Sequence, residues 1–130
     1  MDGSEETNSL TGAIIGAAIR VHSKLGPGLL EHTYARCLQL ELERTGHRVD
    51  SELLVDLEYE GLVVPPAYRI DLMVDDTVVV EVKAVHKLDP VHHSQVVTYL
   101  KLTDKKVGLL LNFNVPSLPD GIKRFVNRLI

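Results

Sequence analysis

The sequence predicts an α/β fold in which a mixed central β-sheet is flanked by helices, with a core in the order α-β-β-β-α-β. Three observations support this fold class. Residues 10–45 show apolar side chains at helical spacing, residues 53–83 show apolar residues that alternate or cluster as in strands, and a helical segment near residues 89–103 separates two Val- and Leu-rich strands. With 130 residues, of which 45% are hydrophobic and 25% charged, one domain with a substantial core is expected over residues 9–130.

The composition excludes several classes of protein. No apolar run approaches the roughly 20 residues that a membrane span needs, and the acidic N-terminus lacks the order of a secretory signal. Cys37 is the single cysteine, so neither an intrachain disulfide nor a multi-cysteine metal site can form. We therefore expect a cytoplasmic protein without membrane contact. The net charge is −4, but residues 83–130 carry eight Lys and Arg against three Asp and Glu, which permits a local contact with an anionic partner.

The first helix is predicted from Ser9 or Thr11 to Leu25, after a disordered leader at residues 1–8. Its apolar positions recur at helical spacing, and Gly26-Pro27-Gly28 ends it. These positions are Leu10, Ile14, Ala18, Val21 and Leu25.

A second helix is predicted from Leu29 to Thr45, with Gly46 after its end. Its apolar stripe comprises Leu30, Tyr34, Cys37, Leu38 and Leu42. Glu31 lies at the border of this stripe. A glutamate there is favoured by the helix dipole alone, and the alternative is a carboxylate that points into a cleft.

Strands are predicted at residues 53–59 and 62–64, joined by a turn at Glu60-Gly61 and ended by Pro65-Pro66. A hairpin follows, with strands at residues 68–74 and 78–83 and the loop Asp75-Asp76-Thr77.

This hairpin brings two carboxylates together. Its three-residue loop pairs Val74 with Val78, Leu72 with Val80, and Asp71 with Glu81. Ile70, Leu72 and Val74 then share one face, whereas Asp71, Glu81, Lys83 and Arg69 lie on the other. Directly opposed Cβ atoms are about 5 Å apart, so the two carboxylates repel each other unless a cation lies between them.

Towards the C-terminus, Asp89 and Pro90 are expected to cap a helix that reaches about Thr103, with Gln95 and Tyr99 on one face. Residues 107–113 are predicted as a strand buried on both faces and parallel to residues 78–83. Residues 122–130 fit either a strand or a helix.

The pair Asp71 and Glu81, with the backbone carbonyl of Val82, offers the oxygen ligands that Mg²⁺ and Mn²⁺ prefer. A metal ion there would activate water against a phosphodiester, and Lys83 could position that water. The alternative is a solvated strand face with a Glu–Lys pair, although Val79 shows that this face is not uniformly polar. His86, His92 and His93 lack the pattern of a zinc site and fit a surface loop.

Residues 25–34 resemble the signature of the GxxExxY protein family, carried by Gly28, Glu31 and Tyr34. Asp71, the Glu81-Val82-Lys83 tripeptide, the segment from Gln95 to Leu100 and residues 108–113 follow in that family's order, so the resemblance covers about residues 10–128. The family is placed in the PD-(D/E)XK nuclease superfamily, whose restriction-endonuclease-like core has the same α-β-β-β-α-β order. One departure is Ile70, which stands where the superfamily name has proline.

The resemblance implies a Mg²⁺- or Mn²⁺-dependent nuclease, a hydrolase of nucleic-acid phosphodiesters, with DNA as the expected partner. It implies that Asp71, Glu81 and the Val82 carbonyl are metal ligands, that Lys83 is catalytic, and that Glu31 supplements the site. Gln95 with Tyr99 resembles the Gln-x-x-x-Tyr element of RecB-type nuclease domains, which helps to hold the site and the DNA. Substrate contacts are expected from Tyr34, Arg69 and Tyr99, although a structural ion pair suits Arg69 equally.

Two alternatives remain open from the sequence. The first is a catalytically silent module that kept the fold and binds nucleic acid or protein, which the net acidity favours. The second concerns assembly, because small nucleases of this fold often form homodimers or act with a partner protein.

Overall fold

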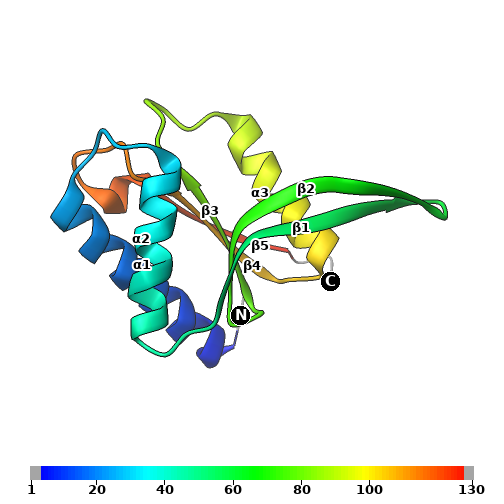
Figure 1. The fold of residues 1–130 in the computed structure, drawn as a ribbon, viewed down its shortest axis with the longest axis horizontal. Coiled ribbons are helices and arrows are strands. Elements are labelled where there is room, and N and C mark those ends of the chain that lie inside the picture. Colours follow the sequence, from blue (N-terminus) through cyan, green and yellow to red (C-terminus); the bar gives the residue numbers. More distant parts are fainter. Residues whose placement is uncertain (1–3, 128–130) are drawn as a thin grey trace.

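Five strands form one mixed sheet in the order β1-β2-β3-β4-β5, with helices on both of its faces (Figure 1). The structure, a computed structural model, describes residues 4–127. The helices are α1 (Glu5–Leu25), α2 (Glu31–Arg44), α3 (Pro90–Thr103) and the short 3-10 helix η1 (Leu118–Gly121). The strands are β1 (Val49–Tyr59), β2 (Leu62–Val74), β3 (Val78–Lys83), β4 (Val107–Asn112) and β5 (Ile122–Val126). The predicted fold class is confirmed: β3 and β4 are parallel, and the other neighbouring strands are antiparallel.

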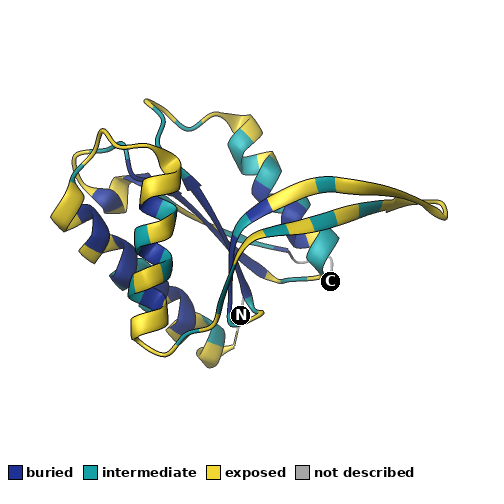
Figure 2. Cartoon of the chain, viewed as in Figure 1, coloured by how far each residue is buried: buried dark blue, intermediate teal, exposed yellow. Residues whose placement is uncertain are grey.

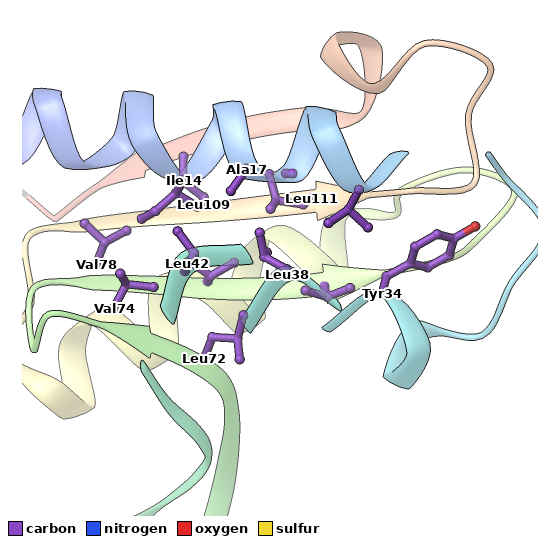
Figure 3. Packing of buried hydrophobic residues seen from close by; sticks show 14 of the residues in the cluster. Ile14, Ala17, Tyr34, Leu38, Leu42, Leu72, Val74, Val78, Leu109 and Leu111 are labelled. Carbon is purple, nitrogen blue, oxygen red and sulfur yellow. The ribbon is translucent and has the colours of Figure 1, made fainter. Parts of the chain in front are cut away.

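The core has two parts, one on each face of the sheet. Between the sheet and helices α1 and α2, side chains such as Ile14, Leu38 and Leu109 pack without solvent exposure (Figure 3). On the other face, Val79 and Leu100 belong to a smaller cluster under α3. Both faces of the central strands are therefore covered, which explains why β3 and β4 are almost entirely apolar.

Helix α1 begins earlier than the sequence predicted. Ser4 is its N-cap, and the Ser4 hydroxyl accepts a hydrogen bond from the Thr7 backbone N–H. Residues 5–8 are therefore helical, so the predicted leader is wrong there, whereas residues 1–3 lie outside the described part of the chain. Of the predicted stripe, Leu25 alone is exposed, at 40%.

Helix α2 starts at Glu31, two residues later than predicted, and ends at Arg44. Leu30 is its N-cap and is 78% exposed, so its predicted place in the apolar stripe is wrong. Gly46 follows the helix with a φ of +91°, which favours glycine.

Beyond the sheet, residues 53–68 of β1 and β2 continue as a projecting two-stranded arm, largely exposed in Figure 2. The predicted interruption at Pro65-Pro66 is wrong, because β2 runs through both prolines. A register shift accommodates them: Val55 pairs with Tyr68, whereas Leu57 pairs with Val64.

The C-terminal elements match the predicted boundaries closely. Asp89 caps α3 in a capping box with His92, and Pro90 is the first helical residue. Every residue of β4 is buried. The ambiguous tail forms the edge strand β5 over residues 122–126, antiparallel to β4. Its last three residues, 128–130, lie outside the described part of the chain.

Candidate active site

The predicted carboxylate pair lies where strand β2 separates from β3. The β2–β3 ladder pairs Val74 with Val78 and Leu72 with Val80, as predicted, and it ends at the pair Leu72–Val80. Strand β3 continues beside β4 as far as Lys83. Asp71 is therefore the first residue of β2 beyond the β2–β3 ladder, where backbone groups of both strands are left for other partners.

The two carboxylates bind these backbone groups. The Asp71 side chain accepts a hydrogen bond of 2.8 Å from the Val82 N–H, and Glu81 accepts a longer one of 3.4 Å from the Asp71 N–H. The predicted backbone pairing of Asp71 with Glu81 is thus replaced by contacts between side chains and backbone. The prediction that the hairpin brings the carboxylates together is confirmed.

Burial gives this pair unusual acid–base properties. Glu81 is 3% exposed. Desolvation, and then the neighbouring Asp71 charge, raise the pKa of Glu81 to about 8 from a usual value of 4.5. Desolvation also raises the pKa of Asp71. Near neutral pH the pair therefore retains a proton, which is a sign that the site favours a cation between the two carboxylates.

Lys83 lies beside the pair. Its Nζ is 3.4 Å from Glu81 Oε2, and its side chain is 14% exposed. The positive charge of Lys83 opposes the rise in the pKa of both carboxyl groups. The alternative of a solvated Glu–Lys pair is wrong, because both side chains are largely withdrawn from water.

The donor set fits one hard divalent ion that retains water ligands. Within residues 4–127, no three carboxylate, imidazole or thiol groups gather closely enough to hold a metal ion. Mg²⁺, however, is usually held by one or two carboxylates, with water and substrate phosphates as its other ligands. Asp71 and Glu81 satisfy that requirement without a third side chain.

Glu31 faces Asp71 across a small pocket of about 170 Å³ that both residues line. Its charge contributes to the raised pKa of Asp71, although less than burial does. Glu31 opens α2, as the helix-dipole interpretation expects, and it also lines the pocket that adjoins Asp71. Direct ligation of a metal by Glu31 stays a prediction. Sequence analysis did not identify His32 and Arg36, which line the same pocket and lie one turn of helix apart.

A second pocket, of about 420 Å³, adjoins Lys83 and is lined by Gln95 and Tyr99 of α3. The predicted placement of these two residues on one face is confirmed, since both side chains line this pocket. Burial of Tyr99, followed by the Glu81 charge, raises its pKa to about 12, so the phenol stays protonated. Tyr68, which the sequence analysis did not select, also lines this pocket.

The predicted substrate contact of Tyr34 is wrong. Its side chain is fully buried and stacks on Phe113 with ring centroids 4.5 Å apart. The Tyr34 hydroxyl donates a hydrogen bond to the Gly26 carbonyl and accepts one from the Leu29 N–H. Gly28, in the same loop, has a φ of +103°, which other residues rarely adopt. Tyr34 and Gly28 therefore shape the loop that delivers Glu31 to the start of α2.

Arg69 forms a surface ion pair with Glu52, with 3.2 Å between Nη1 and Oε1 and both side chains more than half exposed. Of the two interpretations of Arg69, the structure favours the ion pair. The predicted alternation of β2 also fails here, because Ile70 packs under α3 while Leu72 and Val74 face α1 and α2. The alternation breaks at Asp71, which lies opposite Glu52 of β1, and the φ of Glu52 is +51°.

The three histidines lie where the sequence predicted, His86 in the loop before α3 and His92 and His93 in the first turn of that helix. His86 is exposed, and His92 Nδ1 accepts a hydrogen bond from the Asp89 N–H. The His93 ring packs against Phe125, with ring centroids 5.4 Å apart.

Comparison with known proteins gives one match. A family model described as the PD-(D/E)XK nuclease superfamily matches residues 8–125, nearly the whole chain. Searches of curated proteins and of solved structures each gave no match. The finer resemblance to the GxxExxY family stays a prediction. In the described part of the chain, none of the helices is both long and apolar enough to cross a membrane.

Proposed function

The chain belongs to the PD-(D/E)XK nuclease superfamily, and on that premise we propose that it is a Mg²⁺- or Mn²⁺-dependent nuclease that hydrolyses phosphodiester bonds in DNA. One observation carries the proposal: Asp71 and Glu81 meet in a buried position where burial raises both pKa values, with Lys83 3.4 Å from Glu81. A pair of carboxylates that only stabilised the fold would not need to be adjacent and desolvated, because that arrangement is costly.

Each residue has a distinct role in the proposed reaction. Asp71, Glu81 and the Val82 carbonyl would hold the metal ion, which would supply Lewis-acid chemistry to the attacking water and the phosphate. Lys83 presents its ammonium group to the attacking water and to the negative charge that develops on the phosphate oxygens. Gln95 and Tyr99 form the wall of the pocket beside Lys83, and Glu31 lines the pocket that adjoins Asp71.

The test is a cleavage assay on single-stranded and duplex DNA with Mg²⁺, Mn²⁺ or EDTA. We expect cleavage only with metal, and a loss of at least a hundredfold in Asp71→Asn and Lys83→Ala, since general acid–base and electrostatic groups contribute roughly 10²–10⁴-fold each. Lys101→Ala is the matched control, because Lys101 is an exposed lysine on α3. If Lys83→Ala cleaved as fast as wild type, the proposed catalytic site would be wrong. Metal-independent binding without cleavage would favour the alternative of a silent binding module.

A further inference from the structure

The pocket beside Lys83 contains an exposed aromatic ring on a buried support. Tyr68 is 38% exposed, whereas Tyr99 beneath it is 3% exposed. The two rings meet edge to face, with centroids 6.0 Å apart and an interplanar angle of 69°. This contact limits the orientations of the Tyr68 ring and leaves part of it accessible in a pocket of about 420 Å³.

The other groups around this ring suit a nucleobase. Ser94, Gln95 and Thr98, all on α3, bring hydroxyl and amide groups to the pocket, and such groups bond to the polar edge of a base. Lys83 lines the same pocket and is also beside the carboxylate pair. A nucleotide whose phosphate reaches Lys83 would therefore place an adjacent base near Tyr68.

The surroundings of the pocket disfavour a second strand. Tyr68 is at the base of the arm, and residues 53–68 of the arm include three carboxylates and no Lys or Arg. A duplex that extended along the arm would bring its phosphates, at about one charge per 1.7 Å of helix axis, towards these carboxylates. One strand has a lower charge density and exposes its bases for stacking, which does not depend on base identity.

We propose that the Tyr68 pocket binds one unpaired nucleobase adjacent to the scissile phosphate, and that the substrate is therefore single-stranded nucleic acid. This inference rests on the nuclease function proposed above and assigns its substrate class. Tyr68 provides the stacking surface, and Tyr99 acts as a positioning residue that holds the Tyr68 ring.

The test measures the affinity of the full chain for three fluorescein-labelled 12-mers by anisotropy. These are a single strand, its blunt duplex, and a strand of the same length with abasic sites throughout. Ca²⁺ replaces Mg²⁺, and a gel confirms that the oligonucleotides stay intact. We expect Tyr68→Ala to bind the single strand about tenfold more weakly, as removal of one stacking contact predicts, and to bind the abasic strand as wild type does.

Two variants serve as controls. Tyr68→Phe keeps the ring and should bind like wild type, and Tyr59→Ala removes an exposed tyrosine from the arm without touching the pocket. Equal losses on the single and abasic strands, unchanged affinity in Tyr68→Ala, tighter binding of the duplex, or no binding of any oligonucleotide would each overturn the inference. Failure of the nuclease proposal is distinct, because it would leave Tyr68-dependent binding of the single strand without metal-dependent cleavage.

Discussion

Replacement of Glu81 by glutamine should stabilise the metal-free protein, and this gain should grow with pH. Glutamine has nearly the same shape and no charge. Its amide N–H can donate to the Asp71 carboxylate, and its one amide oxygen can accept from Lys83, whose Nζ now lies 3.4 Å from Glu81. The Asp71 N–H then loses only its long contact of 3.4 Å with Glu81. The variant therefore removes the desolvated carboxyl group without leaving a cavity.

The magnitude follows from the raised pKa of Glu81, about 8 in the folded protein against 4.5 normally. Below pH 4.5 the carboxyl is protonated in both folded and unfolded chains, so its contribution to stability is fully present. As the pH rises towards 8, the unfolded chain releases this proton while the folded chain retains it, and the free energy of unfolding falls by up to about 1.4 kcal/mol per pH unit. Between pH 5 and pH 7 the difference between Glu81→Gln and wild type should thus grow by about 2.5 kcal/mol.

The assay is urea unfolding with EDTA at pH 5, 6, 7 and 8, followed by the same series with Mn²⁺. Mn²⁺ at a hundred times its dissociation constant should stabilise wild type by about 2.7 kcal/mol, and Glu81→Gln far less. Glu58→Gln is the matched control, because Glu58 is exposed on the arm. A stability difference between Glu81→Gln and wild type that did not change with pH would refute the reasoning that Glu81 is held protonated by burial and by Asp71.

Two further predictions concern the framework of the site. Tyr34→Phe should lower the free energy of unfolding, measured in urea, by about 1–3 kcal/mol, since the Gly26 carbonyl and the Leu29 N–H lose their partner. The control Tyr59→Phe should change the free energy of unfolding by less than about 0.5 kcal/mol. Gly121→Ala should destabilise by about 1–3 kcal/mol, because a Cβ there would lie 2.2 Å from the Asn112 carbonyl oxygen. Gly12→Ala, at a helical position with open space around it, should instead raise the free energy of unfolding by about 1 kcal/mol. Thermal unfolding measures both variants, and a stabilised Gly121→Ala or a destabilised Gly12→Ala would contradict this account.

The central hairpin could be predicted from sequence because one rule determines it. The loop length and the two-residue period of strands fix which side chains face each other, and the observed pairs Leu72–Val80 and Val74–Val78 follow from that rule. The capped helix α3 was equally predictable, since Asp89 and Pro90 are local signals that do not depend on the rest of the fold. In both cases neighbouring residues hold all the information.

The two-residue period failed where β2 separates from β3. Strict alternation placed Arg69 on the side of Asp71, but in the structure Tyr68 lines the Lys83 pocket and Arg69 pairs with Glu52 at the surface. The break in alternation coincides with the end of the β2–β3 ladder and with the positive φ of Glu52 on the neighbouring strand, and residues 68–74 carry no local signal of either. The two-residue period of a strand therefore predicts the orientation of side chains least well where a ladder ends, and the candidate site lies at such a position.

The Gly28, Glu31 and Tyr34 motif shows why spacing alone could not assign roles. The family resemblance implied a place at the site for both Glu31 and Tyr34, although Tyr34 also belonged to the predicted apolar stripe of the helix. In the structure, Tyr34 turns into the core and binds the loop through Gly26 and Leu29, while Glu31, at the first position of α2, reaches the pocket beside Asp71. One motif thus serves folding and the candidate site together: the buried tyrosine fixes the loop, and the loop fixes where the exposed glutamate can point.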